Sequence, residues 1–305
     1  MNGMGPEERI ERPAPRAVLS RRAFLQAGSL FLAGAASGAA WGRLGRRSVA
    51  KVGILADLHH ADKMEAGGRY YRMALPKLRE AFRLQAREGL DRIVHLGDLV
   101  DSVKDVDQEE IAIQTVANEF RAFGTPYHFL MGNHCLSAVD KCRYRDLTST
   151  AGRHEHFDVG GVRFLCLDAC FRSDARPYAR GNFDWRDAAI PFPQRAWLRH
   201  ELRDAPGPCV VLVHQLLDPV PNYCVSNHEE VRNILARSGK VLAVIQGHYH
   251  QNRYTEIDGI PYIVLRSLIE GPNVTDRGSS VLQVFDDGSA VLKGFSLQHS
   301  YALNR

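Results

Sequence analysis

The sequence has no internal repeat of 20 to 50 residues and no low-complexity segment after residue 48, which excludes a repeat architecture. It also lacks the ~20 consecutive, strongly apolar residues that a membrane-spanning helix needs. Its Ala- and Gly-rich run from Ala27 to Ala40 is shorter than that. What remains is a chain of 305 residues, 45% hydrophobic and 24% charged, a composition typical of globular enzymes. Strand and helix patterns run through it without an obvious linker, which favours one large domain over two small ones.

An excess of charge is likewise missing from most of the chain. Residues 1–48 contain eight Arg and three Glu, so the formal charge of +4 belongs to this leader. The 31 basic and 32 acidic residues of the remaining chain nearly cancel. A near-neutral body gives no sign of a nucleic-acid-binding surface. We therefore expect no nucleic-acid partner, and the oligomeric state stays open.

The leader, residues 1–48, has the features of an export signal. The pair Arg21 and Arg22 precedes Phe24, Leu25 and the weakly hydrophobic run. This order resembles a bacterial twin-arginine signal, which predicts export by that translocase to the periplasm or another extracytoplasmic site. Small residues within this run suit cleavage, and a leader that stays uncut as a membrane anchor is the alternative.

The six cysteines do not require disulfide bonds. The twin-arginine route moves folded chains out of a compartment that keeps thiols reduced, and most of the cysteines lie in apolar strand patterns, as packed thiols do. Cys135 and Cys142 could pair, but nothing in the sequence requires it. The full set is Cys135, Cys142, Cys166, Cys170, Cys209 and Cys224.

The predicted domain, residues 49–305, alternates between strand and helix patterns. Continuous apolar runs predict buried strands at residues 49–56, 93–96, 127–131, 162–167, 209–213 and 242–245. Helical spacing predicts helices over residues 70–88, 108–123, 193–202 and 229–237. The turn pairs Asp258-Gly259 and Asp287-Gly288 predict two hairpins near the end of the chain. Together these elements predict an α/β fold, a four-layer αββα sandwich with two mixed sheets.

Five short polar clusters follow the apolar runs. They are Asp57-Leu58-His59, Gly97-Asp98-Leu99-Val100-Asp101, Gly132-Asn133-His134, His214, and Gly247-His248-Tyr249-His250. Each is weak alone, because a His at a strand end is usually a hydrogen-bonding residue and Gly-Asp is usually a turn. Their joint order, D-x-H, G-D-x-x-D, G-N-H, H and G-H-x-H, resembles the calcineurin-like metallophosphoesterases. The resemblance spans residues 57–250.

The residue types of these clusters suit divalent metals. Carboxylate and amide oxygens with neutral imidazoles favour Mn, Fe or Zn over a metal that prefers thiolates. Residues two apart on an extended strand face the same side, which predicts that Asp57 converges with His59 and His248 with His250. The glycines expected to permit a tight backbone at the clusters are Gly97, Gly132 and Gly247.

The resemblance implies a role for each cluster residue. The implied ligands are Asp57, His59 and His250 for one metal, Asn133, His214 and His248 for the other, and Asp98 as the bridge. A hydroxide shared by the metals would attack phosphorus in line, and His134 would protonate the leaving oxygen or stabilise the phosphoryl group. Asp101 and His95 would orient ligands through hydrogen bonds. His60 is the alternative to its neighbour His59, which the spacing favours.

A narrower resemblance concerns the substrate. The segments Arg69-Tyr70-Tyr71-Arg72 and Leu268-Ile269-Glu270-Gly271 are similar to those of the manganese-dependent ADP-ribose/CDP-alcohol diphosphatase branch, which hydrolyses nucleoside diphosphates linked to a second group. The chain departs from that branch, which has Gln in place of His59. Segment 176–185 is rich in Arg and aromatic side chains that suit phosphate and base contacts and equally suit packing. The candidate substrate contacts are Tyr70, Tyr71, Arg180 and Asn182.

The leading hypothesis is an enzyme that hydrolyses a phosphodiester or phosphoanhydride, including a nucleoside-diphosphate-linked substrate, at a dinuclear centre. A phosphomonoesterase is the nearest alternative because the same metal pair serves both reactions. A non-catalytic binding scaffold would be expected to lose ligands, and this chain keeps them all. A structural zinc protein would need closed Cys/His tetrads, which the ligand set does not form.

The leader also bears on the metal. Sites built from nitrogen and oxygen ligands bind Zn more tightly than Mn or Fe. An enzyme that needs a weaker-binding metal therefore gains by folding before export. We expect two divalent ions, with Mn or Fe favoured and Zn as the alternative.

Overall fold

The computed structural model describes residues 45–103, 105–150, 154–182 and 184–303. The twin-arginine motif and the predicted cleavage region lie outside the described residues. Contacts within the chain separate residues 1–46 from residues 47–305, and this second unit contains the strands and helices of the fold. None of the helices in the described ranges is both long enough and apolar enough to cross a membrane.

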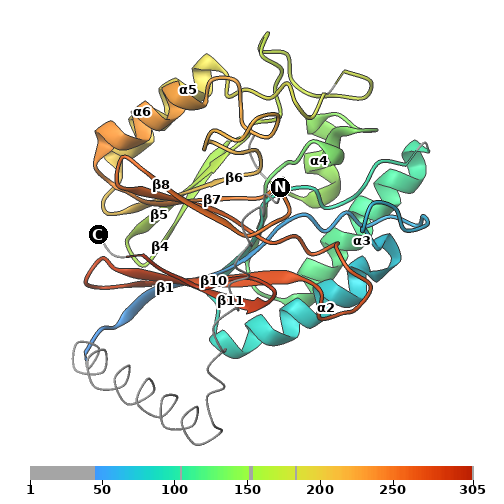
Figure 1. Ribbon diagram of the computed structural model, residues 1–305, viewed down its shortest axis with the longest axis horizontal. Helices are drawn as coiled ribbons and strands as arrows, with labels where there is room; N and C mark the ends of the chain where they lie inside the picture. Colours follow the sequence, from blue (N-terminus) through green and yellow to red (C-terminus); the bar gives the residue numbers. More distant parts are fainter. Residues whose placement is uncertain (1–44, 104, 151–153, 183, 304–305) are drawn as a thin grey trace, which may run out of the picture. The chain divides into compact units, whose positions relative to one another are not determined.

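Two six-stranded sheets form the centre of this unit (Figure 1). The first has the order β12 (Tyr301–Leu303), β11 (Ala290–Ser296), β10 (Gly278–Phe285), β1 (Ser48–Leu55), β2 (Arg92–His95), β3 (Tyr127–Phe129). The second has the order β4 (Glu155–Val159), β5 (Val162–Leu167), β6 (Cys209–Val213), β7 (Val241–Gln246), β9 (Ile260–Val264), β8 (Arg253–Ile257). Parallel pairs (β1 with β2, β6 with β7) and antiparallel pairs (β1 with β10, β8 with β9) occur in both, so both sheets are mixed as predicted.

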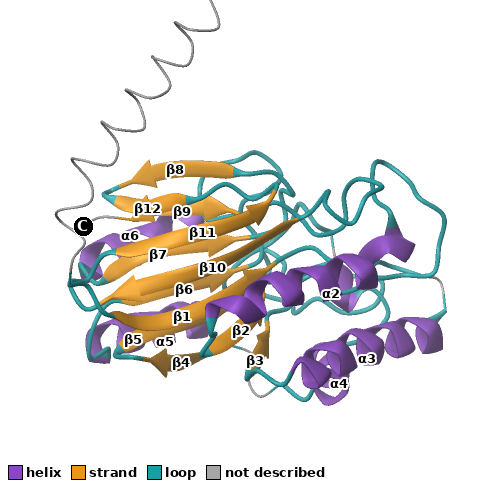
Figure 2. Cartoon of the chain, turned by 90° about the horizontal axis from the view of Figure 1, so that it is seen from below, coloured by secondary structure: helices purple, strands orange, loops and turns teal. Residues whose placement is uncertain are grey.

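Helices cover the outer faces of the sheets (Figures 1 and 2). The helices beside the first sheet are α2 (Ala74–Gln85), α3 (Val106–Phe123) and α4 (Lys141–Thr148). Those on the second sheet are α5 (Phe192–Asp204) and α6 (His228–Ser238). Three short 3-10 turns complete the set, η1 (Tyr71–Met73), η2 (Ala86–Glu88) and η3 (His134–Leu136).

Three apolar clusters hold the layers together. Between the sheets, Ile54 of β1 packs in one cluster with Leu212 of β6. On the outer face of the first sheet, Leu55 packs with Phe120 of α3, and on the second sheet Val211 packs with Leu198 of α5. Each fully buried side chain of this size contributes about 1.5–3 kcal/mol. Neighbouring residues of one strand thus enter cores on opposite faces, and the predicted four-layer αββα sandwich is confirmed.

Helix α3 shows how local chemistry sets the bounds of an element. The Asp105 side chain accepts a hydrogen bond from the backbone N–H of Gln108 at 3.2 Å and caps the first turn. The helix ends at Gly124, whose φ of +81° favours glycine. The predicted helix over residues 108–123 is therefore present, two residues longer at its start.

The remaining predicted strands and helices are present with small shifts, and three elements were not predicted. The strand predicted over residues 127–131 ends early, at Phe129. Helix α4 (KCRYRDLT) has too few apolar residues for a helical period, and β4 (EHFDV) buries only Phe157. Strand β12 has three residues, too few to show an alternation.

The six cysteines, all within the described residues, form no disulfide bonds. Cys135 is buried and Cys142 is exposed, and the two form no disulfide. The expectation that most cysteines are packed thiols is confirmed for the four buried ones, Cys135, Cys166, Cys170 and Cys209.

Candidate metal centre

The polar clusters meet because the loops that carry them hydrogen-bond to one another. After β1 and β2, the His59 N–H donates to the Asp98 carbonyl at 2.9 Å. After β6 and β7, the Gly247 N–H donates to the His214 carbonyl at 3.1 Å. The two sheets are joined across this edge by the His248 N–H, which donates to the Asp57 carboxylate at 3.1 Å. Residues almost 200 positions apart thus share one site.

The backbone at these clusters is left-handed, not extended. The φ values are +56° at Asp57, +47° at His59, +54° at Asp98, +68° at His248 and +67° at His250. Asp57 and His59 converge as predicted, whereas potential ligand atoms of His248 and His250 fall in two different groups. The reason given for convergence, alternation along an extended strand, was wrong. Left-handed backbone costs a residue other than Gly roughly 1–3 kcal/mol, and the loop contacts described above stabilise it.

The glycines serve two different purposes. Gly97 has a φ of +116°, which a side chain would disfavour. Gly132 has no positive φ, but a Cβ there would lie 2.2 Å from Asp98 Oδ1. At Gly247 a Cβ would lie 2.9 Å from Asp57 Oδ2. Two of the three glycines therefore let carboxylates approach the backbone closely.

The predicted ligands form two adjoining groups. In one group, potential ligand atoms of Asp57, His59 and His250 all lie within 4.8 Å of one another, and His59 Nε2 is 3.1 Å from His250 Nε2. The other group, by the same criterion, is Asp98, His214 and His248. Asp98 Oδ2 lies 3.3 Å from His214 Nε2 and 3.5 Å from His59 Nε2. Asp98 therefore stands between the groups, where a bridging carboxylate would be needed.

The unpaired atoms of this site fit metal ions. Asn133 Oδ1 and His248 Nε2 are buried and have no hydrogen-bond partner among the described residues. Leaving such an atom unpaired costs about 1–3 kcal/mol, and a bound cation would remove that cost. The donor set, carboxylate and amide oxygen with imidazole nitrogen, suits Mn, Fe or Zn. That each residue binds a metal stays a prediction.

Burial and charge prepare the imidazoles and carboxylates for this role. Burial lowers the pKa of His59 to about 4 and that of His248 to about 3, so both rings are neutral and can donate a lone pair. Burial opposes ionisation of Asp57, but the neighbouring His250 holds the pKa of Asp57 below its usual range. Against its own burial, the Asp57 carboxylate raises the pKa of His250 to about 9. A metal ion would take the place of that proton.

Asp101 connects the first ligand group to His134. Its Oδ2 lies 3.3 Å from His59 Nδ1, and its Oδ1 lies 3.3 Å from His134 Nδ1. Burial opposes ionisation, but hydrogen bonds from His134 and His59 hold the pKa of Asp101 well below its usual range. The His134 side chain is 23% exposed. Asp101 therefore contacts both His59, a predicted ligand, and His134, whose ring reaches solvent. This position suits the supporting role predicted for Asp101.

His95 and His60 lie beside the centre without joining a ligand group. His95 Nδ1 accepts a hydrogen bond from the Gly97 N–H at 3.2 Å, so it supports the turn that carries Asp98. Burial lowers the pKa of His95 to about 3, and its ring is neutral. The His60 backbone pairs with Leu99 and Val100, and His60 belongs to none of the His/Cys/Asp/Glu groups within the described residues. This placement favours His59 over His60.

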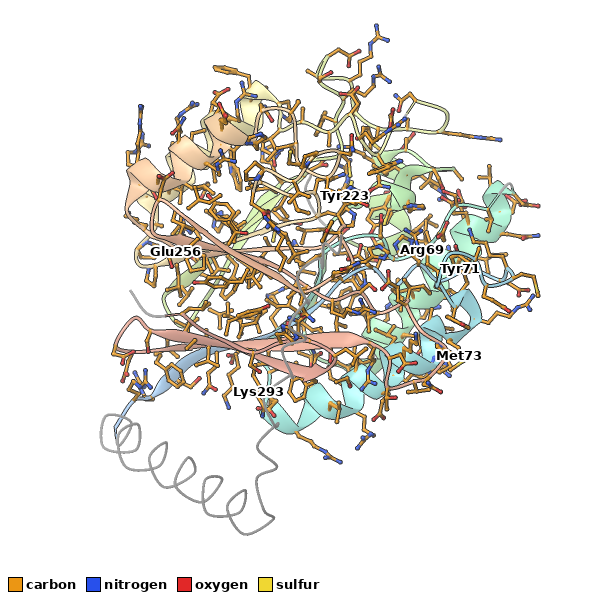
Figure 3. All side chains as sticks on the ribbon, in the orientation of Figure 1. Arg69, Tyr71, Met73, Tyr223, Glu256 and Lys293 are labelled. Carbon is orange, nitrogen blue, oxygen red and sulfur yellow. The ribbon has the colours of Figure 1, made fainter. Side chains whose placement is uncertain are left out.

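The four candidate substrate contacts lie in different surroundings. Tyr71, labelled in Figure 3, belongs to a buried apolar cluster. Lys63 Nζ lies 4.3 Å from its ring centroid. The Asn182 amide is engaged within its own loop, accepting from the Ala179 N–H and donating to the Pro177 carbonyl. Arg180 is exposed, whereas Tyr70 is half-buried. The structure thus gives Tyr71 and Asn182 packing and loop contacts, and substrate contact by any of the four stays a prediction.

Two cations and a carboxylate near the centre were missed as individual residues. Lys63 Nζ lies 2.8 Å from Asp101 Oδ1, and Arg69 Nη1 lies 3.2 Å from Asp101 Oδ2. Glu270 Oε1 lies 3.2 Å from His250 Nδ1 and orients that ring. Arg69 and Glu270 belong to the two segments that carried the narrower resemblance. The sequence therefore pointed to both residues, but it assigned neither of them a role. Lys63 had no signal.

Fold and site together define a class of protein. The four-layer sandwich brings two groups of oxygen and nitrogen donors to one edge of its sheets, with a carboxylate between them and a partly exposed histidine beside them. Paired sites of this kind serve in-line displacement at phosphorus. The protein is a metal-dependent hydrolase of phosphoric esters.

The family model for the calcineurin-like phosphoesterase matches residues 50–252, and the chain belongs to that family. The manganese-dependent ADP-ribose/CDP-alcohol diphosphatase of Arabidopsis thaliana is 23% identical over 76% of this chain and 90% of its own length. The enzyme with the same description from Danio rerio is 26% identical over 72% of this chain and 88% of its own.

Solved structures agree in fold. A dimetal phosphatase from Danio rerio superposes with a TM-score of 0.75 at 22% identity, covering 85% of this chain and 99% of its own. A purple acid phosphatase from yellow lupin has a TM-score of 0.55 at 18% identity, covering 84% of this chain and 54% of its own. At these identities the likeness concerns the fold alone.

Proposed function

We propose that the chain hydrolyses a phosphodiester or phosphoanhydride, with nucleoside diphosphates linked to a second group as the preferred class. One observation carries this proposal. Lys63 and Arg69 place two positive charges against the single carboxylate of Asp101, next to His134. The leaving group of a phosphoanhydride is a second phosphate, whereas that of a monoester is an alcohol. The phosphate brings more negative charge to this position.

The residues around His134 support a role in protonating the leaving group. Its Nδ1 is directed at Asp101, so Nε2 is the ring nitrogen that can reach a substrate. The Asp101 carboxylate fixes the orientation of the ring, as proton transfer to the leaving oxygen requires. Two bound divalent ions would supply positive charge for the phosphoryl oxygens and an acidified water. The relatives named as ADP-ribose/CDP-alcohol diphosphatases support the same substrate class.

A panel of substrates tests the proposal. Purified protein with added Mn would be assayed against ADP-ribose, CDP-choline, a bis-aryl phosphate and an aryl monophosphate. Hydrolysis of anhydrides at a kcat/KM at least tenfold above that of the monoester supports the proposal. The reverse order would replace it with a phosphomonoesterase, which the same metal pair can serve.

We propose further that residues 1–48 direct export of the folded, Mn- or Fe-loaded protein by the twin-arginine route. A fusion of these residues to a reporter that needs folding before export would be compared with a variant in which Arg21 and Arg22 are both replaced by Lys. Export of both fusions alike would refute the route. Elemental analysis of protein from the cell envelope that finds Zn alone would refute the proposed metal.

A further inference from the structure

Two aromatic side chains, Trp185 and Tyr223, lie against one side of the metal centre. Trp185 lies on the loop between β5 and α5, and Tyr223 on the loop between β6 and α6 (Figure 3 marks Tyr223). Their ring centroids lie 6.0 and 5.5 Å from that of His248, and 5.3 Å from each other. The two rings therefore adjoin the second ligand group.

The backbone holds this aromatic pair in place. The loops are tied together where the Ser226 N–H donates to the Ala188 carbonyl at 2.7 Å and the Asn227 amide donates to the Ile190 carbonyl at 2.7 Å. Tyr178, a buried residue of the loop that carries Trp185, donates its hydroxyl to the carbonyls of Asp184 and Asp187 at 2.9 and 2.8 Å. Both loops follow strands of the same sheet, so the pair is fixed relative to the centre.

Exposure distinguishes the two rings. Tyr223 is half-buried and packs edge-on against Tyr249 at 4.8 Å, which fixes its ring. The Trp185 side chain is 36% exposed and is one of the few large apolar side chains that reach solvent within the described part of the chain. A fixed, exposed indole beside a polar centre offers a π-face to a planar ligand.

Charge is distributed unequally around the centre. Lys63 and Arg69 contact Asp101, which adjoins His59 and His134, whereas the aromatic pair contacts His248. The cation nearest the pair, Arg186, lies 5.7 Å from the Trp185 ring centroid, and its charge is paired with Asp184 at 3.2 Å. A molecule with phosphates at one end and a planar ring at the other matches this polarity. Nucleoside diphosphates have that form, because the base is planar and the phosphates are anionic.

We propose that Trp185 and Tyr223 form a stacking site for the purine or pyrimidine base of the substrate. This inference rests on the proposed function for the reaction that the enzyme performs. The stacking itself does not depend on it, because base stacking can be measured without turnover. Stacking of one base on an aromatic side chain contributes about 1–3 kcal/mol, which corresponds to at least about fivefold in affinity at 25 °C.

Product binding tests the site directly. The dissociation constants of AMP and ribose 5-phosphate would be measured for Mn-loaded wild type, Trp185→Leu, Trp185→Phe, Tyr223→Leu and Phe192→Leu. The first ligand carries a base and the second does not. Phe192 is 66% exposed at the start of α5 and serves as the control aromatic.

The expected result is that wild type prefers AMP by about tenfold, and that Trp185→Leu removes the preference while ribose 5-phosphate binding stays unchanged. Trp185→Phe and Phe192→Leu should retain the preference. A preference that persists in Trp185→Leu and in Tyr223→Leu overturns the stacking site. Unchanged metal content and ribose 5-phosphate binding show that the Leu variants are folded.

The same proteins separate this inference from the proposed reaction. A Trp185-dependent preference for AMP in an enzyme that hydrolyses only monoesters would keep the stacking site and remove the anhydride substrate. If Trp185→Leu and Tyr223→Leu both hydrolysed ADP-ribose as wild type does, the proposed reaction would stand and the stacking site would be refuted.

Discussion

The backbone N–H of His134 donates a hydrogen bond to Asp98 Oδ1 at 2.8 Å. Asp98 is the carboxylate between the two ligand groups, and His134 is the partly exposed histidine beside them. The position of the predicted proton donor is thus coupled to the position of the predicted bridging ligand. The close approach is possible because residue 132 has no side chain.

Asp98 and His134 should separate metal binding from proton transfer. Asp98→Asn keeps a residue that tolerates left-handed backbone, but it removes the charge shared by both sites. We expect this variant to lose both turnover and bound metal. His134→Ala should lose turnover by about 10²–10⁴-fold and keep its metal. Elemental analysis with steady-state kinetics measures both, and metal loss from His134→Ala would contradict its assigned role.

Gly132→Ala should damage the centre by steric contact alone. The new methyl group would lie 2.2 Å from Asp98 Oδ1 and 2.4 Å from the Asp98 nitrogen, so the loops must separate. We expect a stability loss of about 1–3 kcal/mol and weaker metal binding, measured by urea unfolding and Mn titration. Gly181→Ala is the control, because Gly181 has a φ of +80° but open space around it. Equal metal affinity in both variants would refute the steric explanation.

Glu109 should act as a positioning residue for the His134 loop. Its buried carboxylate accepts hydrogen bonds from the Ser137 hydroxyl at 2.6 Å, the Ala138 N–H at 3.0 Å and the Val103 N–H at 3.3 Å. These bonds connect α3 to the segments that follow Asp101 and His134. Glu109→Ala should therefore lower kcat by about tenfold or more with a smaller change in KM and no loss of metal.

The neighbouring residue provides the control for Glu109. Glu110 is the next residue of α3, and its carboxylate pairs with Arg143 at the surface. Glu110→Ala should leave kcat and KM unchanged. If Glu109→Ala raised KM alone, a role in positioning His134 would be excluded.

The pH dependence of stability should reveal the His128–Glu155 pair. His128 Nε2 lies 2.8 Å from Glu155 Oε1. Burial opposes the charge, but the Cys166 sulfur and the Glu155 carboxylate raise the pKa of His128 to about 10. Because this pKa lies above the unfolded value of about 6.5, the stabilisation is complete below that pH and is lost as the pH rises toward 10.

The measurement is the free energy of unfolding of wild type and His128→Gln between pH 6 and pH 10. We expect a gap of about 2 kcal/mol at pH 6 that shrinks steadily as the pH rises. His200→Gln, which removes an exposed pair with Asp204, should show little effect at any pH. A gap for His128→Gln that stays constant to pH 10 would refute the ionised pair.

The order of elements and the composition of the site could be predicted from the sequence. Apolar runs and helical spacing are local patterns, so most strands and helices follow from them. The elements missed, α4, β4 and β12, are short and have little apolar periodicity, and packing against neighbours stabilises them. The donor types are also local, because each cluster follows its strand directly.

Only the tertiary structure decided how those clusters meet. Left-handed backbone at Asp57 and His248 brings the donors together, and it persists because loops from distant parts of the chain hydrogen-bond across the sheet edge. The contacts of Lys63 with Asp101 and of Trp185 with His248 have the same origin. They join residues 38 and 63 positions apart, which no local pattern relates, and they depend on how the folded loops meet at this edge of the sheets.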